Sequence, residues 1–154
     1  MTKLPIKMRS IAPRLDGIAK DVAKLRQLGA LDEKEFCSAD KDHFDVAKLR
    51  LREALEGVFN IGAHILSRME GGRTTEYKEI AKKLGEFGIV EKEFAQKALK
   101  RMAGYRNRLT HFYAEIGAKE LHRIIQNDLG DFEIFMKKVK ALLEHPERFS
   151  LEVE

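Results

Sequence analysis

Apolar residues recur every three or four positions along almost the whole chain, and this spacing is the strongest constraint on its fold. Between residues 11 and 25 the apolar positions include Ile11, Leu15, Ile18, Val22 and Leu25. Steps of three and four place these side chains on one face of a helix with 3.6 residues per turn. No stretch alternates apolar and polar residues over the length of a strand, and the 154 residues include only three prolines. The sequence therefore predicts an all-α fold.

Helix start and stop signals divide the chain into about five helical segments. Capping residues, glycines and the last proline place them near residues 11–29, 38–71, 75–85, 90–113 and 118–145. The second segment would be about thirty residues and roughly 45 Å long, which makes it the spine of the domain. Short connections predict that neighbouring helices pack antiparallel. We expect one domain over residues 1–154, an antiparallel helical bundle with a loose tail from about residue 147.

Composition favours a soluble globular protein, with 44% hydrophobic and 35% charged residues. No apolar run approaches the ~20 residues that cross a bilayer. The basic N-terminus lacks the apolar core of a signal peptide. Cys37 is the single cysteine, so no intrachain disulfide can form. These features predict a cytoplasmic protein without a membrane segment.

The histidines show no metal-binding pattern. None of the five has a spacing such as H-E-x-x-H, and one cysteine cannot build a zinc cluster. We therefore expect no metal and no other cofactor. His64 is either a hydrogen-bonded structural residue or part of a cleft with Asn60, whereas His43, His122 and His145 are expected at the surface.

The fourth segment contains the stretch MAGYRNRLTHFYAEI, residues 102–116, whose polar residues are not required for packing. From Phe94 to Ala114 there are five lysines and arginines and no acidic residue, although the net charge of the chain is only +4. Such a basic face attracts phosphate groups. The candidates for contacts with RNA phosphates are Lys97, Lys100, Arg101 and Arg108.

A regular helix at 100° per residue predicts how this segment is oriented. With Phe94 at zero, the apolar residues fall within one arc, and Asn107 and His111 share a face that points away from it. Arg106 lies outside the apolar arc and about 140° from His111. One straight helix cannot bring these two side chains together. Either the helix bends near Thr110, or Arg106 of one chain meets His111 of another across the axis of a homodimer.

The residue types suit cleavage of RNA without a metal. His111 can take the proton from a ribose 2′-OH or give one to the leaving oxygen. Arg106 can hold the negative charge at phosphorus with two parallel hydrogen bonds, and Asn107 can orient either group. A surface arginine and a surface histidine without catalytic roles, on a plain helical adaptor, have the same spacing. Both interpretations stay open at this point.

The sequence YRNRLTHFY resembles the R-x4-H-x-Y signature of the HepT-like toxins, a branch of the HEPN superfamily. Arg106 and His111 match the signature arginine and histidine, Asn107 its polar neighbour and Tyr113 its tyrosine. Three further stretches are similar to other helices of the family: LREALEGVFNIGAHIL, YKEIAKKLGEFGIV and DLGDFEIF. Together the resemblance covers most of residues 10–143.

The resemblance implies an all-α homodimer that acts as a metal-independent endoribonuclease toxin. Arg106 and His111 would be catalytic in a cleft at the dimer interface, with Asn107 and Tyr113 in support. An MNT-type nucleotidyltransferase antitoxin, as in HepT/MntA pairs, would silence the toxin by transferring AMP to Tyr113. The chain departs from the family at Asn60, where an acidic residue is expected. A non-catalytic module of the same fold, which holds a nucleotide or the nucleotidyltransferase, is the alternative.

Overall fold

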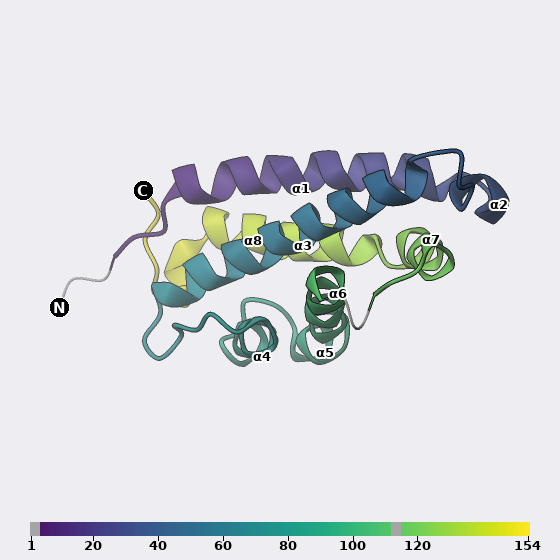
Figure 1. Ribbon diagram of the computed structural model, residues 1–154. Helices are drawn as coiled ribbons and strands as arrows, with labels where there is room; N and C mark the ends of the chain where they lie inside the picture. Colours follow the sequence, from purple (N-terminus) through teal and green to yellow (C-terminus); the bar gives the residue numbers. More distant parts are fainter. Residues whose placement is uncertain (1–3, 112–114) are drawn as a thin grey trace.

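Two long antiparallel helices form one side of the molecule (Figure 1). The computed structural model describes residues 4–111 and 115–154. Helix α1 (Met8–Gly29) packs along α3 (His43–Ser67), and α8 (Gly130–Glu144) runs behind them. The remaining helical elements are α2 (Glu33–Phe36), α4 (Tyr77–Glu86), α5 (Lys92–Phe94), the π-helix η1 (Ala95–Leu99), α6 (Lys100–Thr110), α7 (Ala118–Asn127) and the 3₁₀ helix η3 (Pro146–Phe149). The predicted all-α fold and the long spine helix, α3, are confirmed.

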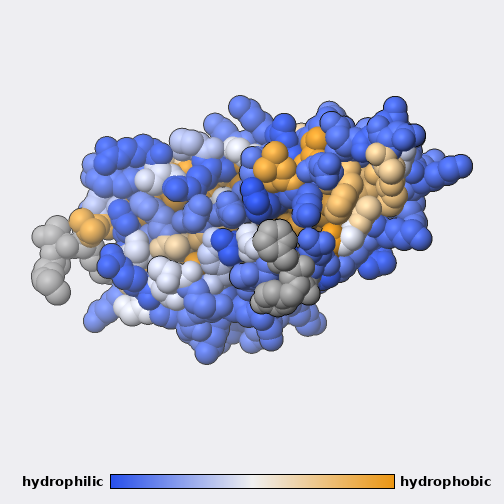
Figure 2. Space-filling model, viewed as in Figure 1, coloured by the Kyte–Doolittle hydropathy of each residue, from blue (hydrophilic) through white to orange (hydrophobic). Residues whose placement is uncertain are grey.

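The core lies between α1, α3 and the helices that cover them. The apolar face predicted for the first segment is buried, and Ile11, Ile18 and Leu25 are at most 1% exposed. Close approach of α1 and α3 depends on Gly57, where an added Cβ would lie 2.9 Å from Cγ1 of Ile18. Figure 2 shows a largely hydrophilic surface, with apolar side chains gathered over part of the α1–α3 side.

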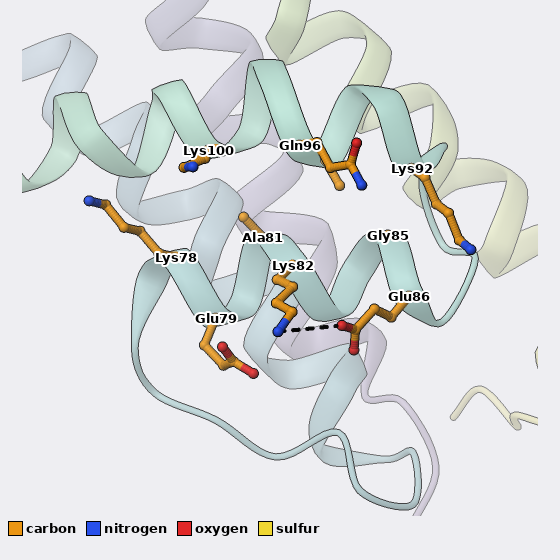
Figure 3. Close-up of a pocket in the computed structure, with 10 residues that line it drawn as sticks. Lys78, Glu79, Ala81, Lys82, Gly85, Glu86, Lys92, Gln96 and Lys100 are labelled. Carbon is orange, nitrogen blue, oxygen red and sulfur yellow. Dashed lines mark ion pairs between the residues drawn. The ribbon is translucent and has the colours of Figure 1, made fainter.

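The arrangement is not a simple antiparallel bundle. Helix α4 lies antiparallel to the continuous α5–η1–α6 run, as Figure 3 shows, and Figure 1 shows both nearly end-on while α1 and α3 lie across the page. The pair therefore crosses the long helices. The N-cap residue of α4 is Glu76, whose carboxylate accepts hydrogen bonds from the backbone N–H groups of Lys78 and Glu79. This cap satisfies two donors that a helix start leaves unpaired.

The expected fifth segment is two helices. It breaks at Asp128, which leaves the helical conformation with φ −110° and ψ 0° and separates α7 from α8. Its carboxylate accepts a hydrogen bond from the Tyr105 hydroxyl instead. With the α5–η1–α6 run taken as one helix, and with the short α2, the described residues form seven helices besides the 3₁₀ helix η3, where the sequence predicted about five.

The C-terminal tail is held in place, which corrects the expectation of a loose segment from about residue 147. Ile6 and Val153 form a parallel β-bridge. The backbone N–H of Ile6 donates to the Glu152 carbonyl at 2.8 Å, and the N–H of Glu154 donates to the Ile6 carbonyl at 2.8 Å. Leu151 is buried against the core. Within the described residues, no helix has the length and apolar character that a membrane span requires.

Candidate functional site

A π-helix changes the face that Arg106 presents. The segment Ala95–Leu99 makes a wider turn than an α-helix, and one extra residue in a turn displaces everything after it by about 100°. Leu99 and Ala103, which a regular helix would place outside the apolar arc, are buried as a result. Arg106 follows the same face inward and is half-buried. The expectation that Arg106 lies outside the core-facing side is therefore wrong.

Arg106 rests on an aromatic platform. Its guanidinium carbon lies 4.1 Å from the centroid of the Tyr77 ring, and that ring stacks on Phe59 with centroids 5.0 Å apart. Glu56 on α3 is 4.0 Å from Arg106, a loose ion pair. The buried Nε of Arg106 has no hydrogen-bond partner among the described residues. A guanidinium that is held by its flat face keeps edge donors for a ligand.

Helix α6 ends at Thr110, the position at which one of the two alternatives from the sequence placed a bend. The Thr110 hydroxyl donates to the carbonyls of Arg106 and Asn107, at 3.2 and 3.1 Å. His111 follows with an extended backbone, φ −116° and ψ 123°. Tyr113 lies outside the described residues.

His111 lines a small basic pocket between α3 and the end of α6. The pocket has a volume of about 270 Å³ and is lined by Lys48, Arg52, Arg108, Leu109, Thr110, His111 and Glu115. Lys48 and Arg52 were not among the candidates from the sequence. Their spacing of four on α3 was a usable signal, because it places both on one face of that helix.

The contacts with α3 also show how Arg106 and His111 lie relative to each other. Arg52 borders the His111 pocket, and Glu56, four residues later, pairs with Arg106. Residues four apart on a helix lie about 6 Å apart on its surface. Arg106 and His111 of one chain thus lie over successive turns of α3, with half-buried Asn107 between them in the sequence.

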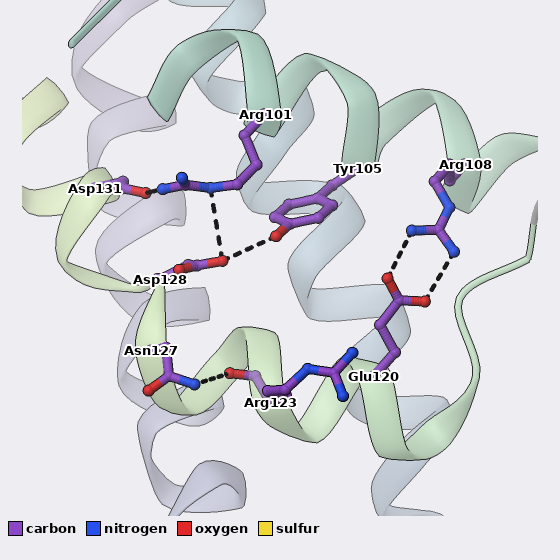
Figure 4. Close-up of polar contacts among 8 residues, drawn as sticks. All are labelled: Arg101, Tyr105, Arg108, Glu120, Arg123, Asn127, Asp128 and Asp131. Atoms are coloured by element: carbon purple, nitrogen blue, oxygen red, sulfur yellow. Dashed lines mark hydrogen bonds and ion pairs between the residues drawn. The ribbon is translucent and has the colours of Figure 1, made fainter. Parts of the chain in front are cut away.

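Part of the predicted basic face is neutralised by α7 and α8 (Figure 4). Arg108 makes two hydrogen bonds to Glu120, at 2.6 and 2.8 Å. This pairing raises the pKa of Arg108 and lowers the pKa of Glu120. Arg101 donates to Asp131 at 2.7 Å. Lys97 is exposed and pairs with Glu93 at 3.1 Å, while Lys100 has no carboxylate within ion-pair distance among the described residues.

The other histidines have structural surroundings. The backbone N–H of Lys7 donates to Nε2 of His64 at 3.0 Å, which confirms the structural interpretation of His64. His122 is 5% exposed, with Nε2 2.7 Å from the Leu31 carbonyl, so the expectation of a surface residue was wrong. Asn60 is exposed. No group of three potential metal ligands occurs in residues 4–111 and 115–154.

Chemically, the site combines the imidazole of His111, the guanidinium of Arg106 and two further cationic side chains from α3, Lys48 and Arg52. An exposed imidazole can exchange protons near neutral pH. Arginine and lysine side chains placed around it attract an anionic substrate and stabilise charge that develops at phosphorus. The arrangement fits acid–base chemistry on a phosphodiester.

Comparison with known proteins agrees with this chemistry. The family model described as "Ribonuclease HepT-like" matches residues 18–139. The chain is 24% identical over 133 residues to the tRNA nuclease HepT of Aphanizomenon flos-aquae, covering 86% of this chain and 89% of the relative. It is 27% identical over 97 residues to the mRNA nuclease HepT of Shewanella oneidensis, covering 63% of this chain and 72% of the relative.

Solved structures show the same fold. The tri-AMPylated Shewanella oneidensis HEPN toxin in complex with MNT antitoxin superposes with a TM-score of 0.75 at 24% identity, over 85% of this chain and 96% of that one. A toxin–antitoxin structure with AMP-PNP gives a TM-score of 0.75 at 21% identity, over 86% and 98%. Because the family model spans well over half of the sequence, the chain belongs to the HepT-like ribonucleases, the HEPN toxins of MNT/HEPN toxin–antitoxin systems.

Proposed function

We propose that this chain is a metal-independent endoribonuclease toxin in which His111 and Arg106 carry the reaction. The observation that supports it most is the placement of both residues over successive turns of α3, beside a basic pocket. The 2′-oxygen of a ribose attacks the adjacent phosphorus as its proton is taken up. The 5′-oxygen of the next nucleotide leaves and gains a proton, so the products carry a 2′,3′-cyclic phosphate and a 5′-hydroxyl.

His111 supplies one of these proton transfers, since it is exposed at the pocket and its imidazole can act as either acid or base. Arg106 holds the negative charge at phosphorus with its free edge while Tyr77 supports its face. Asn107 orients one of these groups. Among the predicted contacts with RNA phosphates, Lys97 and Lys100 are the more accessible, and Arg101 and Arg108 must first leave their carboxylate partners.

The toxin acts as a homodimer and is silenced by an MNT-type nucleotidyltransferase. Two features support a dimer: the apolar side chains over the α1–α3 side in Figure 2, and Gly104, where an added Cβ meets nothing within 4 Å. Light scattering at micromolar concentration should give twice the chain mass. The printed description of the Shewanella oneidensis toxin as tri-AMPylated supports modification here, at Tyr113. Intact mass after incubation with the antitoxin and ATP should rise in AMP units, and Tyr113→Phe should abolish the rise.

The decisive experiment is RNA cleavage in the presence of EDTA. Wild type should cut, and His111→Ala and Arg106→Ala should each lower the rate by about 10²–10⁴-fold. His145→Ala is the matched control, because His145 is a half-exposed histidine beyond α8. If both site variants cut at the wild-type rate, the catalytic assignment is wrong. If wild type does not cut any RNA, the non-catalytic module becomes the better description.

A further inference from the structure

A groove separates α4 from the α5–η1–α6 run, away from the His111 pocket. It has a volume of about 480 Å³ and is lined by Lys78, Glu79, Ala81, Lys82, Gly85, Glu86, Lys92, Ala95, Gln96 and Lys100. Its floor is made of small residues, and the helices approach so closely that a Cβ on Gly85 would lie 2.6 Å from the Cβ of Ala95. The groove is therefore narrow at its base and charged along its rims.

The charges along the groove are mostly uncompensated lysines. Among the described residues, Lys78, Lys92 and Lys100 have no carboxylate within ion-pair distance, whereas Lys82 lies 3.8 Å from Glu86. Figure 3 shows Lys78 and Lys100 at the same end of the groove, one from each helix, and Lys92 at the other end. The Glu79 side chain is directed away from the opposite helix in the same view. Three free ammonium groups thus remain for an anion.

The end of the groove that holds Lys78 and Lys100 lies near the candidate site. Tyr77, the residue before Lys78, carries the guanidinium of Arg106. Lys100 lies on the same helical run, six residues before Arg106. From Lys92 to Arg106 the run extends roughly 21 Å, which is enough to follow several phosphates of one strand. The spacing favours a linear polyanion over a single small anion.

The charge also argues against some other occupants. A second copy of this chain, docked groove to groove, would bring lysines against lysines, and like charges across an interface oppose association. The α1–α3 side, where apolar side chains gather, suits a protein surface better. A sugar–phosphate backbone matches the row of lysines and needs no sequence-specific partner.

We propose that the α4/α5–α6 groove binds the phosphodiester backbone of single-stranded RNA and guides the strand to Arg106. This inference rests on the proposed ribonuclease function and names the path of its substrate. Lys78, Lys92 and Lys100 supply the contacts within the groove. Binding along the groove is independent of base identity, because lysines contact phosphates rather than base edges.

The test measures RNA binding separately from cleavage. All variants are made in a His111→Ala background, and the affinity for a fluorescent 12-nucleotide oligouridylate is measured by anisotropy over a range of salt concentrations. Each phosphate contact on a single strand contributes about 0.7 to the slope of log affinity against log salt. The triple variant Lys78→Gln, Lys92→Gln, Lys100→Gln should therefore lose about two units of slope and roughly tenfold or more in affinity at low salt.

A matched triple variant separates the groove from general electrostatics. Lys20→Gln, Lys137→Gln, Lys140→Gln removes the same charge from exposed lysines on α1 and α8. It should bind RNA nearly as wild type does. A groove triple with arginines in place of glutamines keeps the charge and should keep the slope. It also serves as the test if the glutamine triple does not fold, since lost binding by a folded arginine triple contradicts the proposal.

Two results overturn the inference. One is an equal loss in both glutamine triples, which would mean that total charge alone matters. The other is unchanged RNA binding by the groove triple, which is also the result expected if the lysines serve an acidic protein partner. Failure of the proposed ribonuclease function would give a different result. The protein with His111 intact would then cut no RNA, whereas the anisotropy measurement would still report whether the groove binds RNA.

Discussion

Tyr77 determines how firmly Arg106 is held. The guanidinium lies over the Tyr77 ring, and cation–π contacts of this kind contribute about 0.5–2 kcal/mol. Tyr77→Ala should therefore lower the rate of RNA cleavage by roughly 2- to 30-fold, since Arg106 loses its platform. Tyr77→Phe keeps the ring and should cut at nearly the wild-type rate. Initial rates on one RNA, with helicity checked by circular dichroism, give the comparison. Equal rates for the alanine variant and wild type would remove Tyr77 from the site.

Asn60 is not acidic, and the acidic residue of α3 that pairs with Arg106 is Glu56. It is the carboxylate that pairs with Arg106, at 4.0 Å, and it lies one turn before Asn60 on α3. Glu56→Gln should lower cleavage several-fold, because the guanidinium is then held only by Tyr77. Asn60→Ala should change the rate little. The cleavage rates of both variants, measured in parallel, test this assignment. A larger loss in Asn60→Ala than in Glu56→Gln would mean that Asn60, and not Glu56, orients Arg106.

At the level of helices, most of the secondary structure was predictable from the sequence. The spacing of apolar residues predicted α1 and α3 and their buried faces, because side chains that recur about every 3.6 residues lie on one side of a helix. The π-helix at Ala95–Leu99 was not predictable from that period. A regular wheel assumes 100° for every residue, so it assigned the wrong face to Arg106. The break at Asp128 was also missed, and the Asp128 carboxylate accepts a hydrogen bond from Tyr105, which lies on another helix.

The sequence predicted the residue types of the candidate site better than their partners and placement. Arg106, Asn107 and His111 stand together in the sequence, and the chemistry proposed for them follows from residue type alone. The partners of Arg101 and Arg108 come from α7 and α8, so no local pattern showed that the basic face is partly neutralised. Tyr77, which supports Arg106, is 29 residues away in the chain and had no signature of its own.

The packing of α1 on α3 contains a carboxyl group whose protonation should affect stability. Asp21 is 5% exposed and accepts a hydrogen bond from Arg50 at 3.1 Å. Burial raises the pKa of Asp21 to about 6, with Arg50 opposing and Glu53 adding to the rise. Because its pKa is raised, the Asp21 carboxyl stays protonated to a higher pH in the folded state than in the unfolded state. The associated stability is present below pH 4 and is lost as the pH rises through 6.

Asp21→Asn removes this dependence, because the amide does not titrate. The free energy of unfolding of the variant, minus that of wild type, should increase between pH 4 and pH 7 by up to about 3 kcal/mol. Urea unfolding at several pH values measures both proteins under the same conditions, so the other carboxylates cancel in the difference. A difference that does not vary with pH would mean that the Asp21 pKa is ordinary in the folded protein.

Across the whole molecule, the N-terminal segment pairs with the C-terminal tail and also contacts a histidine of α3. The N-terminal segment pairs with the tail at Ile6 and Glu154, and His64 of α3 accepts the next backbone N–H, that of Lys7. An imidazole can accept this bond at Nε2 only when that nitrogen is unprotonated. Burial, together with the charges of Arg68 and Arg14, lowers the pKa of His64 to about 4. The contact therefore favours neutral His64.

Acid should accordingly release the paired ends before the helices unfold. A lowered histidine pKa gives stability that is present above pH 6.5 and is lost as the pH falls toward 4, about 2 kcal/mol after screening by solvent is allowed for. Amide hydrogen exchange at Ile6 and Glu154 should accelerate between pH 6.5 and 4.5 in wild type, relative to His64→Gln at the same pH. Glutamine still offers an acceptor and carries no charge at either pH, so it separates titration of His64 from the general effect of acid. Equal exchange in the two proteins would show that His64 does not control the closure of the chain ends, and that their pairing depends on the backbone hydrogen bonds and buried Leu151 alone.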